Sequence, residues 1–246
     1  MHIPKTAGTD LTNVLSARHF AIDSAIENPN WFTQDALFRH LRELTLACEF
    51  ADTIFVRGHA RLRYYVNQNL IRPGDQVFTI VRDPIDVVIS GVNYRLTRLM
   101  ADPTGRDTDT RLWLRDLGLQ RVPQNPSQVE LLGLAKRILR EPRVIEDNVL
   151  CMALGNGDAA SALANIVASD IEITDLSRYE AWLSQRWGAA SQHANASTKV
   201  LTADTLDTED RALIEAKTVE DRVLFARLMQ VLDASDGTSI TGRRFA

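Results

Sequence analysis

Met-His-Ile-Pro-Lys-Thr-Ala-Gly-Thr, residues Met1 to Thr9, opens the chain and is followed by Asp10-Leu11-Thr12-Asn13-Val14-Leu15. The apolar residues of the second stretch recur at helical spacing and predict a helix over 10–19. A short apolar start, a polar turn with small residues and then a helix are typical of a strand, a loop and a helix that together hold an anion.

The loop itself has the side chains that such a site needs. Backbone N–H groups converge at the start of a helix, where the helix dipole favours negative charge, and Gly8 lets the chain approach a ligand closely. Lys5 supplies a mobile positive charge. Lys5 and Thr6 precede the glycine, whereas in the pattern G-x-x-x-x-G-K-[ST] they would follow it, so the loop differs from that of ordinary ATPases and GTPases.

A second segment, residues 76–94, has the sequence Gln-Val-Phe-Thr-Ile-Val-Arg-Asp-Pro-Ile-Asp-Val-Val-Ile-Ser-Gly-Val-Asn-Tyr. Its apolar first part predicts a buried strand over 76–81. Asp83 is placed as the N-cap of the next helix, and Pro84 as its first residue. Ser90 then lies on that helix, where it can face the same ligand as Arg82; alternatively, Ser90 and Gly91 form a small-residue contact between packed helices.

The two segments together resemble the sulfotransferases that use 3′-phosphoadenosine 5′-phosphosulfate (PAPS), most closely the heparan-sulfate 2-O- and 6-O-sulfotransferases and their bacterial relatives. In that family, HIPKTGGT-type segments bind the 5′-phosphosulfate, and Arg-Asp-Pro followed by a serine eight residues after the arginine binds the 3′-phosphate. The resemblance implies that the cofactor contacts are Lys5, Thr6, Ala7, Gly8, Thr9, Arg82 and Ser90.

His59 is the candidate catalytic base. It follows Gly58 at the end of a predicted strand over 53–56, where open parallel sheets place their ligand crevice. The resembling enzymes have a catalytic histidine at this place in the order of elements. The alternative is a turn histidine that bonds to a backbone carbonyl. The resemblance also gives Lys5 a catalytic role, because its charge can stabilise the leaving phosphate.

Two further segments are candidates for ligand contacts. Family members often close an Asn/Ser-rich loop with a basic residue over the nucleotide, which makes Thr198 and Lys199 in the loop 191–200 candidate cofactor contacts. The polar segment 100–126 is predicted to be a lid or insertion over the acceptor site, because long irregular segments in compact domains are often binding loops. Its alternative is a disordered surface loop.

The composition is that of an ordinary globular protein. The chain has 246 residues, of which 45% are hydrophobic and 24% are charged, and we expect one domain over 1–246. A net charge of −4 argues against nucleic acid as a partner. Arginines are nonetheless concentrated between residues 57 and 98, which favours anionic ligands there. No zinc-type Cys/His cluster is present, and sulfuryl transfer does not require a metal.

Cysteine usage and hydropathy indicate a compartment. Cys48 and Cys151 lie in apolar runs and are predicted to be buried free thiols in a reducing environment. No apolar stretch reaches the roughly 18 to 20 residues that cross a bilayer, and no signal peptide precedes the first motif. We expect either a cytoplasmic enzyme or a chain that has lost its start.

Strands alternate with helices, which predicts an α/β protein with a parallel sheet. The resemblance implies a P-loop-like three-layer fold, in which a central parallel sheet is flanked by helices. A third strand is predicted over 171–174, a single amphipathic helix over 208–232, and a frayed tail over 237–246.

The expected function is transfer of a sulfuryl group from PAPS to a hydroxyl acceptor, which the resemblance makes a glycan. One alternative is an ATP-dependent small-molecule kinase, with Asp83 as its only placed candidate for a magnesium ligand. Another is a non-catalytic nucleotide-binding relative. The acceptor, the sulfated position and the oligomeric state stay open.

Overall fold

The computed structural model describes residues 7–17, 19–23, 42, 46–47, 49–51, 54–57, 61–67, 71–192, 199–235 and 237–245. The chain forms two compact units. Unit 1 comprises Met1–Arg82, Val149–Asn195 and Glu220–Ala246, and unit 2 comprises Asp83–Asn148 and Ala196–Val219. Each unit is described by itself, and a single domain over 1–246 stays a prediction.

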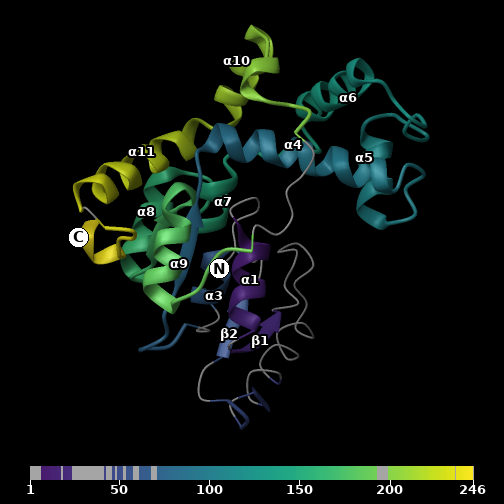
Figure 1. The fold of residues 1–246 in the computed structure, drawn as a ribbon. Helices are drawn as coiled ribbons and strands as arrows, with labels where there is room; N and C mark the ends of the chain where they lie inside the picture. Colours follow the sequence, from purple (N-terminus) through teal and green to yellow (C-terminus); the bar gives the residue numbers. More distant parts are fainter. Residues whose placement is uncertain are drawn as a thin grey trace. The chain divides into compact units, whose positions relative to one another are not determined.

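The described residues of unit 1 form two pairs of parallel strands (Figure 1). In the first pair, β1 (Phe20–Asp23) lies beside β2 (Ile54–Arg57). In the second pair, β3 (Phe78–Val81) lies beside β4 (Glu172–Asp175). The protein is therefore mixed α/β with parallel strands, as expected. The strand β1 was not predicted, and the predicted helix over 10–19 ends earlier, at Ser16.

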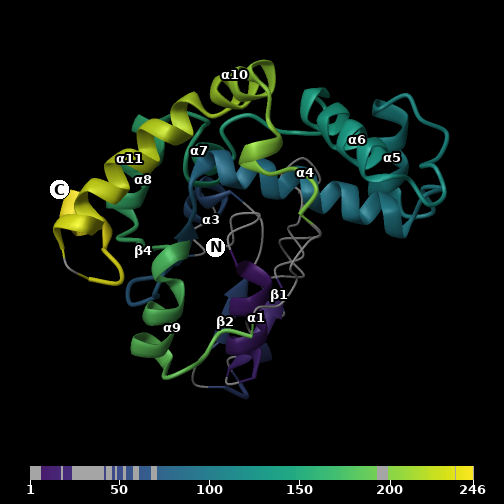
Figure 2. The same ribbon diagram turned by 45° about the horizontal axis from the view of Figure 1, so that its top comes forward.

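The helices of unit 1 lie on both sides of the β3–β4 pair. They are α1 (Gly8–Ser16), α3 (Leu62–Asn67), α7 (Val149–Leu154), α8 (Ala159–Ala168), α9 (Tyr179–Trp187) and α11 (Val219–Ala234, whose first residue belongs to unit 2), with short 3-10 turns η2 (Leu176–Arg178) and η4 (Gly242–Phe245). Phe78 and Ile80 pack with residues of α1 and α9, whereas Val81 packs with residues of α7, α8 and α11. Ile166 of α8 and Leu228 of α11 belong to the same core, and both helices can be followed in Figure 2. Strand β3 is thus covered on both faces.

Unit 2 is helical in the part of the chain that the structure describes. It consists of α4 (Pro84–Ala101), α5 (Thr108–Asp116), α6 (Gln128–Arg140), the 3-10 turn η3 (Ala203–Thr205) and α10 (Thr208–Lys217). Helix α4 contacts α5, α6 and α10. The shared core includes Leu96, Leu99, Leu114, Ile138 and Ile214.

The segment 100–126 is not an irregular loop. Its first residues complete α4, and α5 lies in its middle. Leu114, Leu117 and Val122 are buried in the core of unit 2. The segment therefore helps to build this unit, and its role as a lid over an acceptor stays a prediction.

Two predictions near the C-terminus are wrong. The helix predicted over 208–232 is two helices, because the chain breaks at Thr218, whose hydroxyl donates to the Ile214 carbonyl at 2.8 Å. Such a bond competes with the helical pattern and often bends a helix. The tail over 237–246 is not frayed in its described residues: Ile240 is 3% exposed and forms a β-bridge with Ile173.

Cys151 is a buried free thiol, as predicted, and burial raises its pKa. Cys48 lies outside the described residues. Among the residues that the structure describes, no helix is long and apolar enough to cross a membrane.

Candidate functional site

Several predicted site residues cannot be placed. Lys5, Thr6, His59 and Thr198 lie outside the described residues. The described members are Ala7, Gly8, Thr9, Arg82, Ser90 and Lys199.

Ala7 has an unusual backbone conformation. Its φ of 58° and ψ of 16° lie in the left-handed region. The other non-glycine residues with positive φ in the described chain are Asn125, Asn148 and Asp170, which are residue types that tolerate this region. An alanine held there is strained, and strained backbone residues cluster at active sites, ligand clamps and switch regions.

The start of α1 lacks a side-chain cap. Ala7 is the N-cap residue, and its methyl side chain forms no cap hydrogen bond. Within the described residues, the Leu11 N–H donates to the Ala7 carbonyl at 3.0 Å. An α-helix leaves the N–H groups of its first turn without intrahelical partners. Thr9 is exposed, so this end of the helix is accessible at the position that the sequence motif indicates.

Five other helices in the described chain have a side-chain cap at their start. Helices α4, α5, α6, α8 and α10 begin with a side chain that accepts from a first-turn N–H; the caps are Asp83, Asp107, Ser127, Asp158 and Asp207. Helix α9 also lacks one, but it continues directly from the turn η2, which Asp175 caps. The open start of α1 therefore differs from the common pattern of this chain.

Asp10, in the first turn of α1, points into unit 1. It is 3% exposed. One carboxylate oxygen accepts from the Tyr179 hydroxyl at 2.8 Å, and the other accepts from the Gln192 backbone N–H at 2.7 Å. Burial, followed by the bond to Asp10, raises the pKa of Tyr179, which keeps the phenol protonated as a donor. Sequence analysis gave Asp10 no role, because nothing in its neighbours indicates that an acidic residue of this loop faces inward.

The second motif folds locally as predicted. Strand β3 ends at Val81, Arg82 follows half-buried, and Asp83 caps α4, whose first residue is Pro84. Asp83 Oδ1 accepts from the N–H groups of Ile85 at 2.9 Å and Asp86 at 3.3 Å. Because a carboxylate already uses these amides, a phosphate at this junction would have to be held by side chains.

Ser90 and Lys199 both belong to unit 2, and Asn93 connects their surroundings. Asn93 is 3% exposed and lies one turn after Ser90 on α4. Its Oδ1 accepts from the N–H groups of Val200 at 3.1 Å and Leu201 at 2.9 Å, and its Nδ2 donates to the Leu201 carbonyl at 2.8 Å. The exposed Lys199 is therefore next to a segment that is bound to α4. Sequence analysis missed Asn93, whose only signal is a polar residue in an apolar helical stripe.

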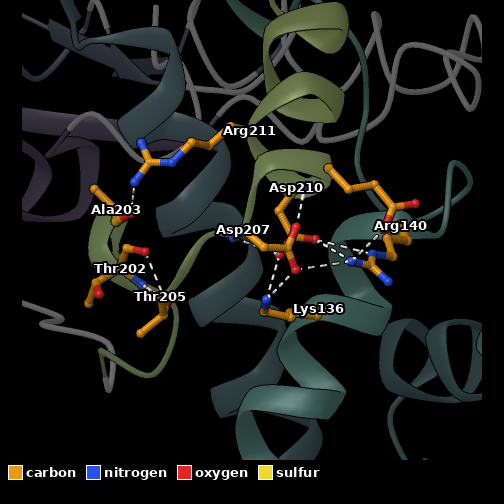
Figure 3. Close-up of polar contacts among 9 residues, drawn as sticks. Lys136, Arg140, Thr202, Ala203, Thr205, Asp207, Asp210 and Arg211 are labelled. Carbon is orange, nitrogen blue, oxygen red and sulfur yellow. Dashed lines mark hydrogen bonds and ion pairs between the residues drawn. The ribbon is translucent and has the colours of Figure 1, made fainter.

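The densest ionic cluster in the described part of unit 2 lies away from the motifs and joins α6 to α10 (Figure 3). Asp210 is fully buried, and its carboxylate contacts Lys136 Nζ at 2.7 Å and Arg140 Nη2 at 2.8 Å. Asp207 also accepts from Lys136 at 2.7 Å, and this bond is the main cause that lowers the pKa of Asp207 to about 2. The carboxylates and cations satisfy one another, so this cluster is structural.

In the part of the chain that is described, no three His, Cys, Asp or Glu side chains gather as a metal site. No family model, no curated protein and no solved structure matches this chain. The resemblance to PAPS-dependent sulfotransferases therefore stays a prediction from the two sequence motifs.

Proposed function

We propose that this chain transfers a sulfuryl group from PAPS to a hydroxyl group of an acceptor, and that the acceptor is a carbohydrate. The observation that carries the proposal is the open start of α1. The motif that would bind the 5′-phosphosulfate leads into a helix without a side-chain cap, through an alanine in the left-handed conformation. A helix start of this kind is suited to an anion, because its amides and its dipole both favour negative charge.

We extend the proposal to a P-loop-like three-layer fold in which the two strand pairs belong to one parallel sheet. Two observations support it. Strand β3 has helices on both faces. The rings of Phe55 on β2 and Phe78 on β3 stack with centroids 6.2 Å apart, so the two pairs are neighbours within unit 1.

In the proposed reaction, an acceptor oxygen attacks the sulfur of PAPS and forms a new S–O bond. The bond between sulfur and the bridging phosphate oxygen breaks, and adenosine 3′,5′-bisphosphate leaves. His59 accepts the proton of the acceptor hydroxyl, because an imidazole with an ordinary pKa near 6.5 is an effective base near neutral pH. Lys5 and the amides of Ala7, Gly8 and Thr9 stabilise the charge on the leaving phosphate.

The other cofactor residues have binding roles in this proposal. Arg82 and Ser90 hold the 3′-phosphate, and Thr198 and Lys199 contact the nucleotide from the loop 191–200. An arginine suits a phosphate because its planar fork can donate two parallel hydrogen bonds. The capped start of α4 explains why side chains would be needed there.

A kinase reaction is the main competing proposal, and it would need a magnesium ligand at a strand end. Asp83 is the candidate, but both of its described bonds serve to cap α4. A test for ATP with magnesium, run beside the test for PAPS, decides between the two.

The first experiment is a calorimetric titration with adenosine 3′,5′-bisphosphate at low salt. We expect binding, and we expect Lys5→Ala and Arg82→Ala each to weaken it by about tenfold or more, because each removes a charge-assisted bond to phosphate. Arg244→Ala is the matched control: it removes an exposed arginine outside both motifs and outside the predicted lid, and it should leave the affinity unchanged. Absence of binding to the unaltered chain contradicts the proposal.

The second experiment measures transfer from labelled PAPS to a panel of glycans. We expect His59→Ala to bind the nucleotide normally and to lose transfer. Turnover close to normal in this variant would remove His59 from the mechanism. Nucleotide binding without transfer to any hydroxyl acceptor would favour the non-catalytic alternative.

A further inference from the structure

We infer that Arg95 of α4, together with Trp113 of α5, binds the carboxylate group of a small organic ligand. Both residues belong to unit 2, so the site lies within one compact unit. The inference concerns a second site and does not depend on the proposed transfer reaction, and its test uses no nucleotide.

The guanidinium of Arg95 is incompletely bonded. Within the residues that the structure describes, its Nε is buried and has no hydrogen-bond acceptor. Its Nη1 donates to the Gly91 carbonyl at 3.3 Å, which is long for a hydrogen bond of this kind. A buried donor without an acceptor costs free energy, and the cost is larger when the group is charged. The Nε–H of Arg95 is therefore a donor that a bound molecule can satisfy.

Arg98 on the same helix shows what Arg95 lacks. Arg98 Nη2 pairs with Asp107 Oδ2 at 3.0 Å, whereas Arg95 forms no ion pair with a described residue. Burial is the largest effect on the pKa of Arg95 and lowers it, while the exposed carboxylates of Glu146 and Asp109 raise it through their charge alone. The positive charge of Arg95 is thus partly desolvated without a bonded counter-ion.

Two neighbours hold this guanidinium in place. Arg95 Cζ lies 5.5 Å from the centroid of the Trp113 ring, a cation–π contact between α4 and α5. A Cβ atom at Gly91 would lie 3.3 Å from Arg95 Nη1, so glycine gives the guanidinium room beside its own helix. Glycine weakens a helix interior, and this close approach gives it a physical reason at that position. A donor that is held in this way is preorganised for a ligand.

A carboxylate suits the site better than a phosphate does. The Nε–H and an Nη–H of a guanidinium form a planar fork, which the two oxygens of a carboxylate match with two parallel bonds. The charges of Glu146 and Asp109 oppose a further anion, and they oppose a doubly charged phosphate more than a singly charged carboxylate. Trp113 is half-buried, so the organic part of the ligand can pack beside its ring.

The experiment titrates sodium acetate into the full-length chain and follows two NMR signals, the Nε–H of Arg95 and the indole N–H of Trp113. Sodium chloride at the same ionic strength is the reference. We expect acetate to shift both signals, with half-saturation on the order of 1 to 10 mM, which is the range that two charge-assisted hydrogen bonds imply. Sodium phosphate, in a third titration, should require a higher concentration than acetate.

A pair of matched variants tests the fork itself. Arg95→Lys keeps the positive charge but has neither the Nε–H nor the planar fork. We expect this variant to need about tenfold more acetate for the same shift of the Trp113 signal. Arg98→Lys is the control, because it makes the same change on the same helix at an arginine that is already paired, and it should leave the titration unchanged.

Three results would overturn the inference. Equal shifts in acetate and in chloride would show that water alone satisfies the Nε–H of Arg95. Tighter binding of phosphate than of acetate would contradict the carboxylate, and an unaltered acetate titration in Arg95→Lys would contradict the role of Arg95. If Arg95→Lys does not fold, the Nε–H signal of the unaltered chain decides the question. Nucleotide binding is measured separately, so a failure of this inference is distinguishable from a failure of the proposed function.

Discussion

The two helices that follow the two motifs begin in opposite ways. Helix α1 starts at Gly8 after an alanine in the left-handed conformation, and no side chain caps it. Helix α4 starts with an aspartate cap and a proline, so its first amides are already bonded. Both starts carry an acidic residue in the first turn, but Asp10 is buried and bonded inward, whereas Asp86 is exposed.

This difference distinguishes two kinds of proposed anion site. The one at α1 would use backbone amides, and the one at α4 would use side chains. At α1 the N-cap residue offers no side-chain acceptor to the first turn, so the proposed contact with the phosphosulfate there would come from the backbone. At α4 the amides are used by the Asp83 cap, so the proposed contact with the 3′-phosphate there would have to come from side chains. A resemblance between sequences groups these two motifs together, but their local chemistry is not the same.

The largest loss of stability is expected at α10, where Asp210, a residue of the capping box, is fully buried. Asp210→Ala should lower the free energy of unfolding by about 2 to 4 kcal/mol, because it removes a buried carboxylate that holds two cations and the capping box of α10. Lys136 and Arg140 keep some exposure and can be rehydrated, which places the loss below the upper end for buried pairs. Urea unfolding followed by circular dichroism measures it.

Glu209→Ala is the control for this prediction. Glu209 is next to Asp210 and contacts the same arginine at 3.3 Å, but its side chain is 79% exposed. We expect a loss below about 0.5 kcal/mol, as is usual for exposed ion pairs. Equal losses in the two variants would show that burial does not distinguish these carboxylates.

The capped starts are also the part of the fold that the sequence predicts best. Asp83 followed by Pro84, and Ser127 with Glu130 three residues later, are local signals, and both helices begin where these residues indicate. Local signals suffice because a cap bonds to amides two or three residues away.

The remaining features depend on partners that are distant in the sequence. Strand β1 is a four-residue run that gains its conformation by pairing with β2. Ile240 is ordered because it meets Ile173, and Asn93 is important because it meets Leu201, 108 residues away. The inward contact of Asp10 is visible only in the fold, because its partner Tyr179 is 169 residues away. The sequence therefore predicts the helix of the first motif but not the contacts that hold this helix.

Removing the cap of α4 tests how much a side-chain cap stabilises the folded protein. Asp83→Ala should reduce the free energy of unfolding by about 1 kcal/mol, since two first-turn amides lose their acceptor. The measurement is again urea unfolding. Asp83→Ser, which keeps a capping oxygen, should recover most of the loss, and failure to recover it would mean that the charge of Asp83 matters more than the cap.

Replacing Ala7 tests how much the left-handed conformation at the uncapped start of α1 costs in stability. Ala7→Gly should raise the free energy of unfolding by about 0.5 to 1 kcal/mol, because glycine enters the left-handed region without the steric cost that alanine has there. Ala226→Gly in the exposed middle of α11 is the control and should lower stability by about 1 kcal/mol. If both glycines destabilise alike, Ala7 does not have the strained conformation described.

The smallest effect is a pH dependence that the loss of the Asp207 cap should show and that Ala7→Gly should lack. Hydrogen bonding from Lys136, the largest cause, lowers the pKa of Asp207 to about 2, whereas an unfolded aspartate titrates near 3.9. A carboxyl group with a lowered pKa stabilises the folded state above the unfolded pKa, and this contribution disappears as the pH falls from about 4 towards about 2. The difference in stability between the unaltered chain and Asp207→Asn should therefore be constant between pH 5 and 7 and shrink below pH 4. Ala7→Gly changes no titrating group, so its difference in stability from the unaltered chain should stay constant across the same range.

A difference for Asp207→Asn that does not shrink in acid would show that the cap acts through its shape. The contrast between the two kinds of helix start would then be steric and not electrostatic.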